Sequence, residues 1–146
     1  MRFALLDTNI LLWVARGGSR LGEEIAHWAD GTVLAVPAVV RRELDHLAEG
    51  SVPYARVARM LGRRYPTVPC YGEGDSAILD CARRSGAVLV TADRALAQRA
   101  RASGVDVLTP RDRSHLTRRA GLVRSGPERG RPGIIIKRTR LVRRPS

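Results

Sequence analysis

Apolar residues along this chain occur in two patterns, short runs and longer stretches with helical spacing. The short runs predict strands at residues 3–6, 32–36, 87–90 and 105–108, with a brief strand near Val68. The helical spacing predicts helices at residues 8–14, 21–29, 38–48, 53–64, 75–85 and 93–103. Strands and helices that alternate in this way indicate an α/β fold, with helices on both faces of a parallel sheet.

The regular pattern ends after His115. The segment RSGPERGRPG then has the composition of a linker, and IIIKRTRLV beyond it has the composition of a late strand. We therefore expect a folded domain at residues 1–116 and a C-terminal extension at residues 117–146.

Charge separates the same two regions. Residues 1–116 contain 16 Arg and 13 acidic residues, whereas residues 117–146 contain 10 basic residues and Glu128 alone, so the formal charges are +3 and +9. A basic extension favours a polyanion such as RNA as its partner. Because 25 of the 26 basic residues are Arg, an Arg-rich solvated tail is the alternative. The candidate RNA-binding residues are Lys137, Arg138, Arg140, Arg143 and Arg144.

Composition also disfavours several classes of protein. No apolar run approaches the roughly 20 residues that a membrane span needs. The N-terminus reaches Asp7 before it can supply the apolar segment of a secretory signal, so we expect a cytoplasmic protein. Cys70 and Cys81 are too few for a disulfide framework or a zinc site, and we expect both to be reduced thiols.

Two acidic residues follow predicted strands. Asp7 interrupts the apolar run FALLDTNILLW, and Asp93 comes directly after residues 89–92. Because the carboxyl ends of parallel strands meet at one rim of the sheet, we expect both side chains there. A buried carboxylate without a partner is costly, so Asp7 indicates a turn, a pairing charge or a metal ion. Thr8 and Asn9 are then placed to cap the next helix.

Two further acidic residues lie on predicted helices. Asp75 falls at the centre of the apolar stripe of its helix, so we expect it to point inward, with helix capping as the alternative. Glu43 lies near the edge of the stripe of its helix and can reach the same rim, although a surface glutamate is the commoner case. Asp45 and Asp80 fall on the outward faces of these two helices.

These acidic residues suggest a metal site. Four carboxylates from four elements repel one another unless a cation holds them together. Because no His or Cys has ligand spacing, the set suits Mg²⁺ or Mn²⁺. Such an ion, in a protein that is otherwise basic, fits the hydrolysis of phosphodiester bonds.

Four segments are informative as an ordered set: LLDTNILLW, VPAVVRRELDHL, GEGDSAILDCARRSGAVLVTADRALAQRARASGV and VLTPRD. In these segments, within residues 2–113, the chain resembles the PIN domain family of metal-dependent ribonucleases. The resemblance implies a three-layer α/β/α fold, an acidic pocket for Mg²⁺ or Mn²⁺, and RNA cleavage. It implies that the catalytic and metal-binding residues are Asp7, Glu43, Asp75 and Asp93. Thr91 and Asn9 are implied to support the acids or to orient phosphate, with a structural cap as the alternative for Asn9.

The resemblance leaves more than one function open. RNA processing, for example of a ribosomal precursor, is favoured because the basic extension goes beyond a minimal toxin domain. A VapC-like toxin held by an antitoxin is the alternative. A non-catalytic adaptor is less favoured because all four acids are present, and a phospho-acceptor domain is disfavoured because residues 1–116 contain no Lys. A homodimer stays open.

Overall fold

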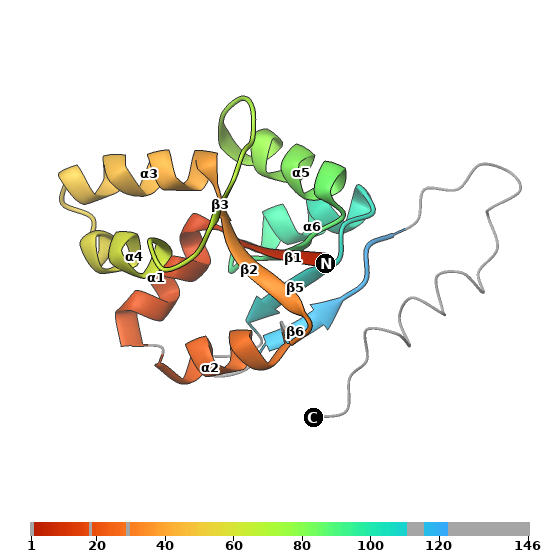
Figure 1. Cartoon of the computed structure of the whole chain (residues 1–146), viewed down its shortest axis with the longest axis horizontal. Coiled ribbons are helices and arrows are strands. Elements are labelled where there is room, and N and C mark those ends of the chain that lie inside the picture. Colours follow the sequence, from red (N-terminus) through yellow and green to blue (C-terminus); the bar gives the residue numbers. More distant parts are fainter. Residues whose placement is uncertain (1, 18, 29, 111–115, 123–146) are drawn as a thin grey trace, which may run out of the picture.

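The computed structural model describes residues 2–17, 19–28, 30–110 and 116–122. They form a six-stranded sheet with the order β3-β2-β1-β4-β5-β6 (Figure 1). The strands are β1 (Arg2–Leu6), β2 (Thr32–Pro37), β3 (Thr67–Val68), β4 (Val88–Val90), β5 (Val107–Pro110) and β6 (Leu116–Arg119). Neighbouring strands run parallel except β5 and β6, which are antiparallel. The sheet is therefore mixed and mostly parallel.

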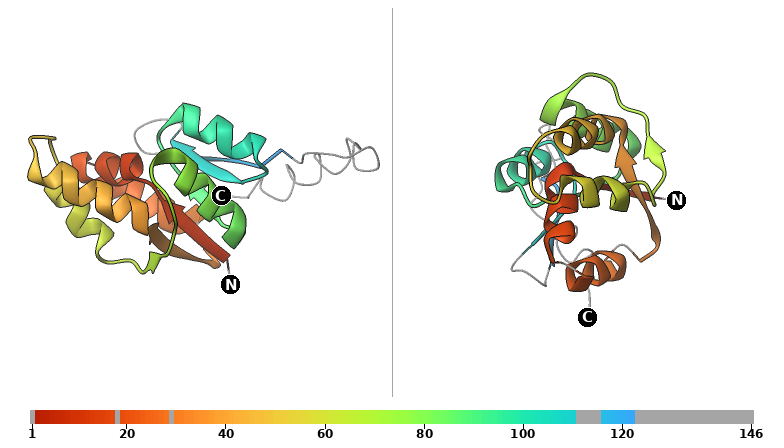
Figure 2. Two further views of the ribbon diagram at one scale, coloured as in Figure 1. Left: turned by 90° about the horizontal axis from the view of Figure 1, so that it is seen from above. Right: turned by 90° about the vertical axis from the view of Figure 1, so that its left-hand side faces the viewer.

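Helices lie on both sides of this sheet. They are α1 (Thr8–Gly17), α2 (Ser19–Trp28), α3 (Ala38–Glu49), α4 (Ala55–Gly62), α5 (Gly74–Ser85) and α6 (Arg94–Ala102). In Figure 1, α3 and α5 lie above the strands and α2 lies below them. Helices α1, α3 and α4 contact one another and form one end of the molecule (Figure 2). This arrangement confirms the predicted three-layer α/β/α fold.

The central strands explain the short apolar runs of the sequence. Leu5 of β1 and Leu89 of β4 are fully buried, as expected for parallel strands that are covered on both faces. The helices bury one stripe each, for example Ile78 and Ala82 of α5. Among the described residues, no helix is long and apolar enough to span a membrane.

The sequence pattern does not predict strand β6, because the apolar pattern ends at His115. Only one residue of Leu116-Thr-Arg-Arg is apolar, and the strand is defined by its ladder with β5, in which Val107 lies opposite Arg119. Helix α4 also begins later than predicted, because Tyr54 has a left-handed backbone with φ of 66°. The segment IIIKRTRLV and the candidate RNA-binding residues lie outside the described residues.

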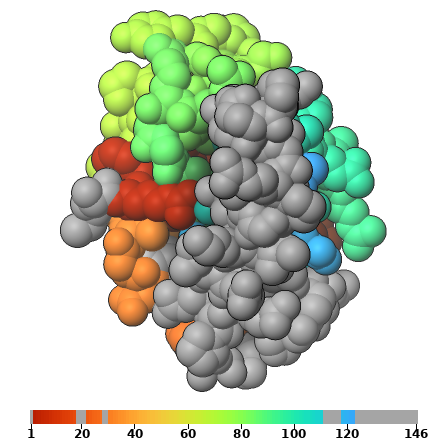
Figure 3. Space-filling view, turned by 90° about the vertical axis from the view of Figure 1, so that its right-hand side faces the viewer, coloured from red at the N-terminus to blue at the C-terminus, as the bar shows by residue number. Residues whose placement is uncertain are grey.

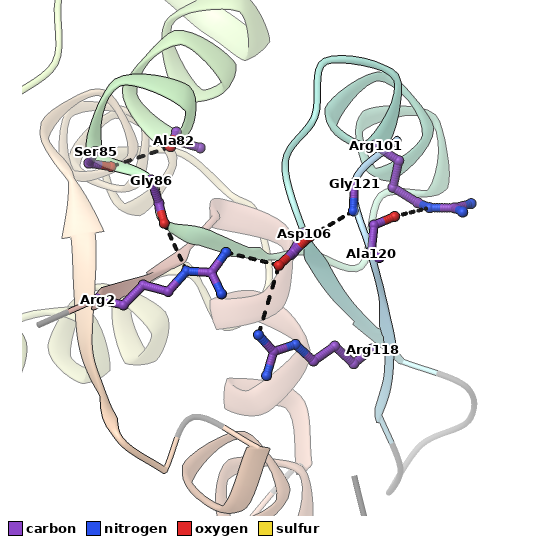
Figure 4. A network of polar contacts seen from close by, with 9 residues as sticks. All are labelled: Arg2, Ala82, Ser85, Gly86, Arg101, Asp106, Arg118, Ala120 and Gly121. Carbon is purple, nitrogen blue, oxygen red and sulfur yellow. Dashed lines mark hydrogen bonds and ion pairs between the residues drawn. The ribbon is translucent and has the colours of Figure 1, made fainter. Parts of the chain in front are cut away.

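A buried carboxylate holds the end of β6 in place. Asp106 accepts hydrogen bonds from Arg2 Nη2 at 2.9 Å and from the Gly121 backbone N at 2.7 Å (Figure 4). Arg118 Nη2 lies 3.9 Å from the same carboxylate. Gly121 packs so closely that a Cβ atom there would lie 2.3 Å from the carbonyl carbon of Gly104. We refer to Arg2, Asp106, Arg118 and Gly121 as the Asp106 cluster.

The Asp106 cluster lies at the rim where the parallel strands begin. In Figure 3 the start of β1, in red, reaches the surface between α5 and β2. A cavity of 630 Å³ lies at this rim and is lined in part by Arg2, Arg83, Asp106 and Arg118. Because Asp106 contacts two of the three arginines, the positive charge of this cavity is offset by the protein itself.

Candidate active site

Three of the predicted acids, Asp7, Glu43 and Asp93, lie around the opposite rim, where the parallel strands end. Strand β1 lies between β2 and β4 in the sheet. After β1 the chain continues to β2 on one side, and after β4 it continues to β5 on the other side. Ligands of open α/β sheets bind in the crevice at such a switch point. Asp7 follows β1 directly, and Asp93 follows the end of β4.

Asp7 is enclosed by the protein, with 2% of its surface exposed. Its Oδ1 accepts a hydrogen bond from the Ile10 backbone N at 2.8 Å, and its Oδ2 accepts one from the Thr91 hydroxyl. The bond from Ile10 makes Asp7 the cap of α1. The expectation that Thr8 or Asn9 caps this helix is therefore wrong, because the chain already turns into the helix at Asp7.

Thr91 connects two of the predicted acids. Its hydroxyl donates to Asp7 and accepts from the backbone N of Asp93 at 2.9 Å. Its own backbone N donates to the Leu108 carbonyl at 3.0 Å, which ties it to β5. Asp93 in turn caps α6, because its Oδ1 accepts from the Leu96 backbone N at 3.0 Å. Thr91 therefore links Asp7 to Asp93, and its role in supporting the acids stays a prediction.

Helix α3 brings Glu43 to the same rim. Strand β2 lies beside β1 and leads directly into α3. Glu43 Oε1 accepts a hydrogen bond from the hydroxyl of Thr8, the residue that follows Asp7. Asp45 lies two residues further along α3 and is directed elsewhere, with its Oδ1 3.8 Å from Arg59 Nη1. Glu43 therefore reaches the rim as its position at the edge of the apolar stripe predicts.

The burial of Asp7 changes the pKa of its side chain. Burial raises the pKa of Asp7 from 3.8 to about 7. The hydrogen bonds from Thr91 and Ile10 act in the opposite direction, whereas the negative charges of Asp93 and Glu43 raise this pKa further. The Asp7 side chain is therefore shielded from solvent. It also lies close enough to Asp93 and Glu43 for their negative charges to raise its pKa.

Asp75 and Asn9 differ from the other predicted residues. The Asp75 side chain is 48% exposed, and its Oδ2 lies 3.7 Å from Arg99 Nη1 on α6. The expectation that Asp75 points inward is therefore wrong. The reason is that α5 begins at Gly74 while its buried residues begin only at Ala77, so the first turn extends beyond the core. Asn9 is exposed, and its side chain has no hydrogen-bond partner among the described residues.

The donor types fit a hard divalent cation, since all four predicted ligands are carboxylates. Among the residues that the structure describes, however, no group of three or more His, Cys, Asp or Glu lies close enough to hold a metal ion. Three of the predicted ligands accept hydrogen bonds within the protein: Asp7 from Ile10 and Thr91, Glu43 from Thr8, and Asp93 from Leu96. Asp75 forms a 3.7 Å ion pair with Arg99. The metal-binding roles therefore stay predictions.

Two partners of these acids, Thr8 and Arg99, are not among the predicted site residues. The position of Thr8 offers a signal, because a hydroxyl beside a strand-end acid faces the same crevice. Arg99 offers none, since it reaches Asp75 from another helix and only the packing of α5 against α6 brings the two together.

This strand order, with acidic residues gathered at the switch point, defines an α/β protein with a candidate acidic active site. Residues 4–113 match the family described as PIN like domain. Since this match covers most of the chain, the protein belongs to that family.

Individual proteins resemble the chain over most of its length. Ribonuclease VapC9 from Archaeoglobus fulgidus is 28% identical over 111 residues, which cover 73% of this chain and 82% of that protein. The structure of the PIN domain endonuclease Utp24 has a TM-score of 0.66 at 21% identity, covering 84% of this chain and 96% of that one. A domain of a functionally unknown protein from Methanocaldococcus jannaschii has a TM-score of 0.59 at 15% identity, covering 77% and 93%. The two structures show a shared fold.

Proposed function

We propose that this protein is an endoribonuclease that hydrolyses RNA phosphodiester bonds with Mg²⁺ or Mn²⁺. The observation that carries the proposal is Asp7, which is buried at the switch point beside Glu43 and Asp93 and is bonded by neutral donors. Membership of the PIN like domain family supports a nuclease, and similarity to the VapC9 ribonuclease supports RNA as the substrate.

The chain prepares this chemistry by orienting its carboxylates. Thr91 and the Ile10 amide hold the two oxygens of Asp7, and the Thr8 hydroxyl holds Glu43. A bound divalent ion would supply a nucleophilic water at neutral pH and neutralise charge on the phosphate. For Asp75 to join Asp7, Glu43 and Asp93 as a ligand, its ion pair with Arg99 has to open.

Two biological roles are consistent with this reaction. RNA processing, with a ribosomal precursor as one candidate substrate, is favoured by the +9 charge of residues 117–146. A VapC-like toxin with an antitoxin as partner is favoured by the 28% identity with VapC9. A non-catalytic adaptor is less favoured because all four acids are present. Cytoplasmic location and a homodimer stay predictions.

Cleavage by the purified full-length chain tests the proposal directly. Structured and single-stranded RNA are incubated with Mn²⁺ or with EDTA, and the new RNA ends are sequenced. We expect defined internal ends that appear only with the metal. The absence of new ends under both conditions, from a protein shown to be folded by circular dichroism, would falsify the nuclease assignment.

Thermal melting tests the metal site without relying on activity. A ligand that binds only the folded protein raises the melting temperature by mass action. We therefore expect millimolar Mn²⁺ to raise the melting temperature, and Asp7→Asn to reduce this increase. An equal increase for Asp80→Asn and Asp7→Asn would place the ion elsewhere, since Asp80 pairs with Arg84 on the outer face of α5.

A further inference from the structure

A second cavity lies beside the acidic rim. It has a volume of 480 Å³ and is formed by α1, α6 and the last strands of the sheet. Its chemically distinctive lining residues are Trp13, Arg94, Gln98, Arg101, Thr109 and Arg119. We call this cavity the arginine pocket.

The charge of the arginine pocket differs from that of the cavity at the Asp106 cluster. Among the described residues, three arginines line each cavity, but no Asp or Glu lines the arginine pocket. Arg94 and Arg119 have no side-chain hydrogen bond or ion pair within the described part of the chain. Arg101 uses its Nε to bond the Ala120 carbonyl at 3.0 Å, and its guanidinium lies away from Asp106 (Figure 4). Within the described part of the chain, the pocket therefore offers an anion positive charge that no lining carboxylate compensates.

Trp13 adds an aromatic surface to this charge. It lies on α1, packs against the core and remains partly exposed in the pocket. Proteins that bind single-stranded nucleic acid combine such aromatic stacking surfaces with arginines that contact the backbone. Gln98, which also lines the pocket, can donate to and accept from the edge of a base.

The pocket is continuous with the acidic rim. Ala92 and Arg94, the residues on either side of Asp93, both line it. Thr109 and Pro110 line it from the end of β5, the strand that pairs with β4. A nucleic acid strand that crosses the switch point at Asp93 therefore enters the arginine pocket next.

We propose that the arginine pocket binds one nucleotide of a single-stranded RNA, next to the bond that is cleaved. The base stacks on Trp13, and the adjoining phosphates contact Arg94 and Arg119. This inference rests on the proposed ribonuclease function, because it assigns the position of the substrate beside the same acids. It goes further by requiring an unpaired base, since a base within a duplex is already stacked on both faces.

Tryptophan fluorescence tests this binding without cleavage. Trp28→Phe leaves Trp13 as the sole tryptophan of the chain. Short single-stranded oligoadenylate is titrated into this full-length variant in EDTA, and we expect the base to quench the fluorescence of Trp13. The same strand annealed to oligouridylate should quench much less. Absence of quenching at concentrations where the RNA is bound overturns the subsite.

Substitutions separate stacking from charge. Trp13→Leu should weaken the affinity for oligoadenylate about five- to 150-fold, whereas Trp13→Phe, which keeps an aromatic ring, should weaken it much less. The double variant Arg94→Gln/Arg119→Gln should flatten the slope of log K against log salt by about 1.4. The matched control Arg63→Gln/Arg83→Gln removes two exposed arginines outside the pocket and should leave the slope unchanged.

The outcomes for the pocket and for the nuclease are distinguishable. Quenching and affinity that depend on Trp13 and Arg94, in a protein that never cleaves RNA with Mn²⁺, support the subsite and overturn the nuclease. Cleavage that occurs normally, with equal affinity for Trp13→Leu and Trp13→Phe and equal salt slopes for the two double variants, overturns the subsite. Circular dichroism of each variant confirms that it is folded.

Discussion

Asp7 and Asp106 are both buried aspartates at strand ends, and they lie at opposite rims of one sheet. They are 2% and 4% exposed. Asp106 is compensated by the chain, since Arg2 and the Gly121 amide donate to it and Arg118 lies nearby. Asp7 receives hydrogen bonds from an amide and a hydroxyl, and the charged groups that affect it are the acids Asp93 and Glu43.

The difference shows how burial of the same residue type can serve structure or function. A buried charge that is paired within the chain ties elements together, as Asp106 ties β1, β5 and the end of β6. A buried carboxylate without such a cation makes folding less favourable, and it persists where a ligand can supply the missing charge. On this comparison the contacts of Asp106 hold the fold together, while the role that we propose for Asp7 is to bind a cation.

The largest expected effect is on activity. Asp7→Asn and Asp93→Asn each remove a charge from the acidic rim, and RNA cleavage should fall by about 10²-fold or more. Asp45→Asn and Asp80→Asn remove exposed carboxylates that pair with Arg59 and Arg84, and should cleave at nearly the normal rate. Initial rates with saturating RNA and Mn²⁺ measure this, and rates unaffected by Asp7→Asn would contradict the contrast between the two rims.

The next largest effect is a dependence of the free energy of unfolding on pH, which should arise from the titration of Asp7. Because its pKa is about 7 in the folded protein and 3.8 in the unfolded chain, the folded state binds more protons between these values. The contribution of Asp7 to the free energy of unfolding of the metal-free protein should therefore be largest below pH 3.8. This contribution should fall by on the order of 4 kcal/mol as the pH rises through 7.

Urea unfolding in EDTA at several pH values measures this effect. Asp7→Asn cannot ionise, so its stability should lack that decline, and the difference between the two proteins should change with pH as the Asp7 pKa requires. Parallel curves for the two proteins would mean that Asp7 is not titrating in this range.

Removal of Asp106 should affect stability with no comparable dependence on a metal. Breaking a buried ion pair costs about 3–5 kcal/mol, and we expect about 3 kcal/mol for Asp106→Ala because the Arg2 side chain is 38% exposed. Asp106→Asn should cost less, since an amide oxygen can still accept from Gly121. Denaturant unfolding measures both variants, and a loss below about 0.5 kcal/mol for Asp106→Ala would show that the cluster contributes little.

The smallest effect on the fold is expected from removing residues 123–146. A chain that ends at Leu122 retains Arg118 and Gly121, so its melting temperature should be unchanged. Its affinity for RNA should fall, with a salt slope that flattens by about 0.7–0.9 for each phosphate that the protein no longer binds. A chain that ends at Leu116 loses half of the Asp106 cluster and should be measurably less stable. Equal stability of the two truncations would remove the structural role assigned to β6.

Much of the fold and part of the site could be predicted from the sequence, for local reasons. Parallel strands buried on both faces leave apolar runs, and Asp7 and Asp93 follow such runs directly. Strand β6 could not be predicted, because two of its four residues are Arg and its pairing depends on β5. Asp75 is exposed because the first turn of α5 extends beyond the core, and its ion pair with Arg99 depends on the packing of α5 against α6; helical periodicity contains neither fact.

For protein engineering, the contacts of Thr91 divide the molecule into parts that can be varied and parts that cannot. The backbone N of Thr91 bonds the Leu108 carbonyl of β5, and its hydroxyl joins Asp7 to Asp93. A substitution at Thr91 therefore alters scaffold and chemistry together, and selection for a new substrate cannot separate the two. Arg94, next to Asp93, and Trp13 lie outside this bond network, so a library intended to change which RNA is bound should hold Thr91 constant and randomise those two positions.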